Sequence, residues 1–176
     1  KLGPTIGSLV REIIPEPLSL QGYGLVVGLR GTGSAECPPQ IRTYLEKYIL
    51  RQLPAREKFD VDSFIASRDT AVVLIEGTTP EMASRGEYFD VKVTAMPGTQ
   101  TISLDGGVLL ETELKIGEQF NVTTKPAADV RGPILVDKIG DSGTDKRAGY
   151  ILAGGKVLVG SRIEMRLDRA DFRLTN

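Results

Sequence analysis

Several stretches of the chain show the hydrophobic patterns of β-strands. Residues 88–95 alternate strictly between apolar and polar side chains, and residues 162–168 follow the same period of two. Residues 70–76 form a continuous apolar run that ends at glycine, which is typical of a buried strand. Residues 20–29 are also apolar but are too short and too rich in glycine for a helix, so they predict another buried strand.

A further alternating stretch covers residues 108–116, and its two faces differ sharply. We expect its apolar residues to face the core and its charged residues to face water. The apolar set is Val108, Leu110, Leu114 and Ile116, and the charged set is Glu111, Glu113 and Lys115. Residues 134–137 and 156–159 are shorter strand candidates.

Residues 39–53 change to the helical period of 3.6 and predict one principal amphipathic helix. Pro38 and Pro39 suit the entry of this helix, and Pro54 ends it. Its apolar face, which we expect in the core, comprises Ile41, Tyr44, Leu45, Tyr48, Ile49 and Leu53. Its opposite, solvated face carries Arg42, Glu46, Lys47 and Arg51.

Together these elements predict a β-dominated α+β fold, with mixed sheets and one principal amphipathic helix at about 39–53. Residues 1–17 contain scattered glycine and proline and suggest an irregular or edge segment. Residues 140–149 are polar and rich in glycine, as in an exposed loop. The sequence shows no convincing internal repeat.

Composition removes several classes of function. The 176 residues hold 22 Lys and Arg, 23 Asp and Glu, and no histidine, so a Ser-His-Asp triad and an imidazole zinc site are excluded. One cysteine, Cys37, cannot form an internal disulfide. The balanced charge argues against nucleic acid as a partner, and no apolar run approaches the ~18 residues of a membrane span. Because the chain begins at Lys1 without a leader, we expect a removed signal segment or a piece of a larger protein.

The run from Gly22 to Gly28 invites comparison with a dinucleotide-binding loop. That fingerprint needs its glycines between a strand and a helix, so that backbone amides point at pyrophosphate. Here the third glycine comes one residue late and the intervening residues favour a strand. We therefore expect these glycines to permit close packing of neighbouring strands.

Three other features suggest chemistry only locally. Residues 141–144, Asp-Ser-Gly-Thr, resemble an aspartic protease turn, but a second carboxylate would have to come from a partner and a glycine precedes the motif. Asp60, Asp62 and Asp69 lack the spacing of a calcium loop, so we expect solvated turn carboxylates. Cys37 precedes the helix, whose dipole favours a thiolate, yet no histidine can pair with it. The sequence thus favours a structural or binding role over an enzyme, and implies no cofactor and no metal.

Five segments, in order, resemble the flagellar basal-body P-ring protein family. The first is the glycine-rich stretch 22–33 with the helix that follows it, and the second runs from Ala71 to Ile75. The third leads through Pro80 and Arg85-Gly86 into Phe89–Val93. The last two are Gly106–Leu114, which resembles a Gly-Gly-x-Leu-Leu-x-Thr-x-Leu segment, and Met165-Arg166-Leu167 with Asp171-Phe172.

The resemblance implies a non-enzymatic, self-associating structural subunit of a periplasmic ring that surrounds the flagellar rod. Its implied partners are other copies of itself, the rod, the neighbouring outer ring and the peptidoglycan layer. We expect residues 1–176 to form a single domain or fragment of such a protein, with two small subdomains around a divergent segment at 118–149 as the alternative. The other hypothesis from a different class is an envelope binding module that holds a protein or glycan partner.

A ring subunit needs a head-to-tail interface, which polar loops between the strands could supply. We expect interface residues in the loop at 31–34, in the turn at Arg85 and in the loop at 140–149. The named residues are Gly31, Thr32, Gly33, Arg85, Asp141, Lys146 and Arg147. None of them is expected to be catalytic.

Overall fold

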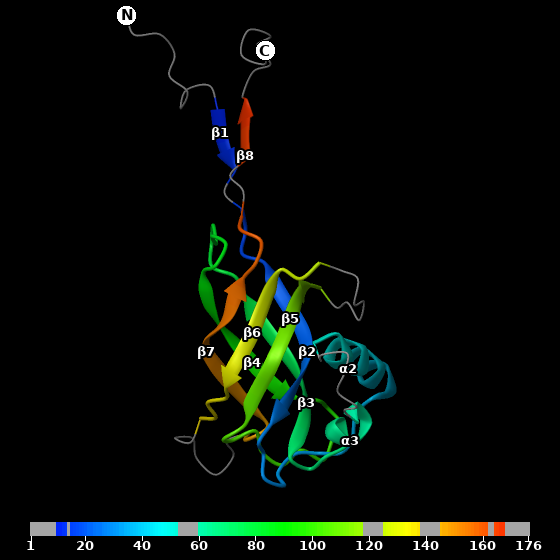
Figure 1. Ribbon diagram of the computed structural model, residues 1–176. Coiled ribbons are helices and arrows are strands. Elements are labelled where there is room, and N and C mark those ends of the chain that lie inside the picture. The colour runs from blue at the N-terminus through cyan, green and yellow to red at the C-terminus, as the bar shows by residue number, and fades with distance from the viewer. Residues whose placement is uncertain are drawn as a thin grey trace, which may run out of the picture.

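A computed structural model describes residues 10–13, 15–52, 60–117, 125–137, 145–161 and 164–167. Its centre is a closed six-stranded barrel (Figure 1). Around the barrel the order is β2 (Ser19–Val27), β3 (Thr70–Thr78), β4 (Tyr88–Ala95), β7 (Ala148–Val157), β6 (Ala128–Pro133) and β5 (Val108–Ile116), which closes on β2. The β-dominated α+β class is confirmed. Every pairing among the described strands is antiparallel, so the expected mixed sheets are not confirmed.

Alternation of side chains fills the barrel interior. In β4 the predicted pattern is confirmed, because Phe89, Val91, Val93 and Ala95 are buried in the interior core and the residues between them are not. In β3 both faces are buried. Val73 points into the barrel, whereas Val72 belongs to a second cluster on the outside, beneath the helices.

Two helices cover the outer face of β2 and β3. The predicted principal helix is α2 (Pro39–Gln52), and a short helix, α3 (Val61–Ile65), follows it in what the sequence suggested was a plain connection. The expected core residues Ile41, Tyr44, Leu45 and Tyr48 are buried, and Ile49 is half-buried against the same cluster. Leu53 lies outside the described residues. On the opposite face Lys47 and Arg51 are exposed, while Arg42 and Glu46 are half-buried.

The remaining strands, β1 (Val10–Ile13) and β8 (Glu164–Leu167), pair with each other and not with the barrel. They form a two-stranded antiparallel sheet beyond one barrel end (Figure 1). The first residues therefore include a strand where an irregular or edge segment was expected. Within the described residues, no helix combines the length and the apolar character needed to cross a membrane.

The predicted faces of residues 108–116 were wrong in part. Val108 and Ile116 are exposed, and Lys115 is only 2% exposed. The register of β5 against β6 shifts between Leu109 and Thr112, so strict alternation fails there. As a result Leu114 lies in the barrel core while Leu110 packs against the outer cluster. Lys115 is buried near the Tyr44 ring of α2, which a local sequence pattern cannot reveal.

Two strand boundaries also differ from the prediction. The expected strand at 134–137 contains only an isolated bridge between Leu135 and Tyr150, and β6 lies just before it. The short candidate at 156–159 overlaps only the last two residues of β7, which starts at Ala148 inside the expected loop at 140–149. The barrel is therefore closed by two strands that the hydrophobic pattern hardly marks.

Candidate interaction surface

The barrel wall built around β7 lies opposite the helices. In the closed strand order, β7 is three strands away from β2 in either direction, and α2 contacts β2. Outward-facing residues of β4, β5, β6 and β7 and the nearby Leu135 form a surface that we call the β7 wall. Its members are Tyr88, Glu111, Asp129, Arg131, Leu135, Tyr150, Leu152 and Lys156.

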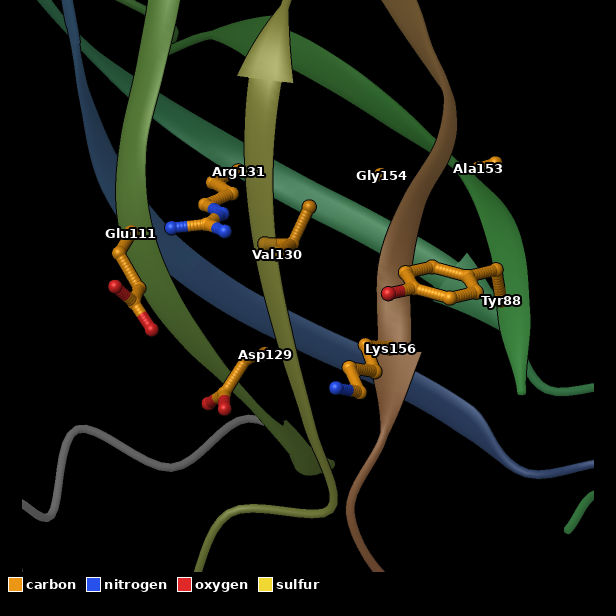
Figure 2. Close-up of a pocket in the computed structure, with 8 residues that line it drawn as sticks. All are labelled: Tyr88, Glu111, Asp129, Val130, Arg131, Ala153, Gly154 and Lys156. Atoms are coloured by element: carbon orange, nitrogen blue, oxygen red, sulfur yellow. The ribbon is translucent and has the colours of Figure 1, made fainter. Parts of the chain in front are cut away.

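A pocket of about 260 Å³ opens in the β7 wall. Figure 2 shows its lining residues on β4, β5, β6 and β7, with the charged side chains of Glu111, Asp129, Arg131 and Lys156 around one hollow. The floor includes Val130 and Gly154. Both signs of charge and one aromatic ring therefore meet in a single open depression.

A bulge in β7 creates this hollow. Val91 pairs with Ile151 and Phe89 pairs with Gly155, so residues 152–154 of β7 face only one residue of β4. Ala153 adopts a positive φ of 49°, and its N–H donates to Asp90 Oδ1 at 2.7 Å. The bulge turns the β7 backbone out of the ladder, and the pairing between β6 and β7 is limited to residues 128–130.

Glycines are required at the bulge. A Cβ on Gly154 would lie 2.3 Å from Ile151 Cγ2, and a Cβ on Gly155 would lie 2.6 Å from Phe89 Cζ. The Gly-Gly pair inside a strand is the one sequence signal that could have indicated this feature, because strand glycines often mark bulges. The sequence analysis did not identify Tyr88, Asp129 or Lys156 as site residues.

Charged residues in and beside the pocket form a row across three strands. Glu113 pairs with Asp129, and Asp129 pairs in turn with Lys156. The Lys156 ammonium lies 5.9 Å from the centre of the Tyr88 ring, in cation–π range. Partial burial raises the pKa of Asp129, and the negative charges of Glu111 and Glu113 raise it further, while Lys156 acts in the opposite direction. The acidic half of the row, formed by Asp129 with Glu111 and Glu113 nearby, thus has an excess of negative potential.

Large apolar side chains are exposed beside the pocket. Leu152 is 61% exposed, Leu135 53% and Tyr150 51%. Leu135 and Tyr150 lie side by side, because their backbones form a β-bridge. A cluster of exposed apolar residues beside a polar pocket is typical of a surface that binds another macromolecule.

Where the β7 wall meets the helices, a second charged cluster that includes Glu113 lies between α2 and β5. Lys115 Nζ is 4.0 Å from Glu113 Oε2 and 5.5 Å from the centre of the Tyr44 ring. Arg51 Nη2 lies 3.6 Å from Glu113 Oε1. Burial lowers the pKa of Lys115, while Glu113 opposes this shift. The Arg51–Glu113 contact joins α2 to β5.

Most of the predicted interface residues collect at one barrel end. Thr32 Oγ1 donates to Leu29 O and Ser103 O, and Gly33 N donates to Arg68 O. A Cβ on Gly33 would lie 2.0 Å from Thr70 O, so this residue serves close packing. Gly31 is exposed with a φ of 87°.

Lys146 and Arg147 lie at the same end. Lys146 O accepts from Leu104 N, and Arg147 Nη2 donates to Met96 O at 3.1 Å. Arg85 is exposed in the β3–β4 connection at the opposite end, and Asp141 lies outside the described residues. The structure therefore brings Gly31, Thr32, Gly33, Lys146 and Arg147 to one barrel end without Arg85, and the role of all these residues at an interface stays a prediction.

The local motifs within the described residues do not form a catalytic site. Gly22 and Gly24 lie inside β2, where a Cβ on Gly24 would come 2.7 Å from Thr112 Oγ1, so they serve strand packing. Burial raises the pKa of Cys37, which argues against a reactive thiolate. Asp60 caps α3, and its hydrogen bonds with Ser63 lower its pKa. Residues 141–144 lie outside the described residues.

Asp62 and Asp69 also make contacts that stabilise the fold. Asp62 lies 3.6 Å from Arg42 of α2, and the Asp69 carbonyl accepts from Leu29 N. In the part of the chain that the structure describes, no three side chains of His, Cys, Asp or Glu are grouped as metal ligands would be.

Comparison with known proteins gives a consistent family. The model of the flagellar P-ring protein family matches residues 13–174. The flagellar P-ring protein of Salmonella choleraesuis (strain SC-B67) is 34% identical over 151 residues, which are 85% of this chain and 38% of that protein. That of Bdellovibrio bacteriovorus is 32% identical over 154 residues, 87% of this chain and 40% of that protein.

A more distant relative shows the same coverage. The flagellar P-ring protein of Leptospira interrogans (serovar copenhageni) is 27% identical over 167 residues, 89% of this chain and 44% of that protein. The chain thus spans less than half the length of these curated relatives.

Proposed function

Because the chain belongs to the flagellar P-ring protein family, we propose that it forms part of a structural subunit of the periplasmic ring of the flagellar basal body. The family is one of structural flagellar proteins and not of enzymes. The observation that carries the proposal is the family match over residues 13–174, which covers the whole barrel. In this role the subunit binds other copies of itself around the rod.

The architecture supports a scaffold. The closed barrel itself has no free strand edge, so contacts between the barrels of neighbouring copies use side-chain surfaces, whereas β1 and β8, among the described strands, each pair on one side only. The β7 wall is such a surface, with exposed apolar residues beside a charged pocket. Among the residues that the structure describes, the polar groups with shifted pKa values lie in structural clusters and in this wall, and they do not combine a nucleophile with a base.

The proposal also includes the partners of the ring, namely the rod, the neighbouring outer ring and the peptidoglycan layer. A ring around the rod touches the rod on its inside, the neighbouring outer ring on one flank and the peptidoglycan layer outside. The mixed charges of the exposed strand faces suit several such polar contacts.

Deletion of the gene in the source bacterium, followed by complementation with the full-length gene, tests this function. We expect non-motile cells whose isolated basal bodies lack the ring around the rod in electron micrographs, and full recovery on complementation. Motile deletion cells with complete rings would contradict the proposal. In that case the alternative, an envelope binding module for a protein or glycan, would be the better account.

A further inference from the structure

We propose that copies of this protein join head to tail, with the outer side of α2 of one copy seated on the β7 wall of the next. Five exposed residues of α2 form a strip that we call the α2 stripe, comprising Gln40, Thr43, Lys47, Leu50 and Arg51. This inference rests on the proposed function and names the two surfaces through which the ring would close.

The positions of the two surfaces fit a ring. A head-to-tail contact that closes uses two different surfaces of each subunit, and neither surface can bind a copy of itself. Here α2 lies against β2, whereas β7 is the strand farthest from β2 in the closed order (Figure 1). A copy that binds through one surface therefore leaves the other surface free for its next neighbour.

The β7 wall is long enough to accommodate α2. The 14 residues of α2 give a helix about 21 Å long. The 10 residues of β7 extend over about 33 Å. The helix can thus lie along the wall over its whole length.

Each surface also exposes apolar side chains that a neighbour could cover. Leu50 of α2 is 57% exposed, in the last turn of a helix whose other face is buried. Leu152 and Tyr150 of the β7 wall are exposed to a similar degree. Apolar residues surrounded by charged ones are the usual composition of an interface centre with its polar rim.

The charges of the two surfaces are complementary where the pocket lies. The α2 stripe presents Lys47 and also Arg51, which lies 3.6 Å from Glu113 of its own chain, and the half-buried Glu46 lies beside the stripe. The acidic half of the pocket presents Glu111 and Asp129. Burial raises the pKa of Asp129 first, and the negative charges of Glu111 and Glu113 raise it further; a cation from another copy would offset those charges. The pocket volume of about 260 Å³ leaves space for a long basic side chain.

Three substitutions in the full-length protein test the inference. Leu50→Asp alters the α2 stripe, and Leu152→Asp alters the β7 wall. Ile102→Asp is the matched control, because Ile102 is 68% exposed but lies in the β4–β5 connection and not on either surface. Tyr150→Asp is a second wall variant, and circular dichroism with thermal unfolding shows whether each variant folds.

We expect assembly of the Leu50 and Leu152 variants to weaken by about tenfold or more, measured by light scattering after size exclusion and by the amount recovered in basal bodies. Ile102→Asp should assemble like the wild type. Folded Leu50, Leu152 and Tyr150 variants that all assemble like the wild type would overturn the inference and leave the proposed function intact. Wild-type protein that is absent from basal bodies would contradict the proposed function itself.

A mixing experiment separates this geometry from other contacts. The Leu50→Asp variant keeps an intact β7 wall, and the Leu152→Asp variant keeps an intact α2 stripe. Equal amounts of the two should therefore form dimers that cannot grow, whereas each variant alone stays monomeric. A mixture that remains monomeric would overturn the head-to-tail pairing of these two surfaces.

Discussion

Leu45 lies at the centre of the contact between α2 and the barrel, and its truncation to alanine tests how α2 is held. The side chain is 1% exposed and belongs to the outer cluster together with Leu25 of β2 and Val72 of β3. Leu45→Ala removes three buried carbons, which at about 0.8 kcal/mol each account for about 2.4 kcal/mol of transfer free energy. The cavity left behind brings the expected loss of unfolding free energy to about 3 kcal/mol.

Urea and thermal unfolding followed by circular dichroism measure this loss. For a chain of this length, about 3 kcal/mol lowers the melting temperature by roughly 6–12 °C. Leu50→Ala on the same helix is the matched control, because Leu50 is 57% exposed and its truncation should change the unfolding free energy by less than about 0.5 kcal/mol. Equal, small effects of the two substitutions would refute the packing of α2 on the barrel.

Three further predictions concern the two charged clusters and the glycine strand. Glu113→Ala leaves the buried Lys115 ammonium without its carboxylate and should lower the unfolding free energy by about 2–4 kcal/mol, whereas Lys115→Met should be neutral or stabilising in the same urea titration. Gly24→Ala places a Cβ 2.7 Å from Thr112 Oγ1 and should cost about 1–3 kcal/mol; an unchanged melting temperature would show that the strands can separate. Because the pKa of Asp129 is raised, the folded state binds this proton more tightly than the unfolded chain, so the associated stability is present below about pH 4 and is lost as the pH rises through the raised pKa. The free energy of unfolding gained by Asp129→Asn over the wild type should therefore be larger at pH 7 than at pH 4. An equal gain at the two pH values would refute the raised pKa of Asp129 in the folded state.

The sequence could predict the elements whose burial follows a local period. β4 alternates because one face fills the barrel and the other meets water, and α2 has its apolar residues at helical spacing because one face covers the barrel. In both cases the environment stays the same along the element. The pattern of Tyr88 to Ala95 and that of Ile41 to Tyr48 therefore report the fold directly.

Elements whose environment changes along their length could not be predicted in this way. β5 contains a register shift, and α2 buries Lys115 on the face that the alternation assigned to water. β7 contains the bulge at residues 152–154, so its apolar residues do not keep one period. Both causes are contacts between residues distant in the sequence, which a local pattern does not contain.

The β7 wall and its pocket were the part of the protein that the sequence predicted least. Its pocket exists because Asp129 of β6 and Lys156 of β7 become neighbours when the barrel closes, and because the bulge of β7 opens a hollow beside them. The residues expected at an interface were chosen from polar loops. Thr32 shows the weakness of that criterion, because its hydroxyl group is engaged in hydrogen bonds within the barrel end.

Electron cryomicroscopy of basal bodies isolated from the source bacterium tests the central claim most directly. The account predicts that density of the ring around the rod contains repeated copies of the six-stranded barrel, with α2 of each copy facing the β7 wall of its neighbour. Ring density that cannot accommodate the barrel would contradict the assignment of this chain to the ring.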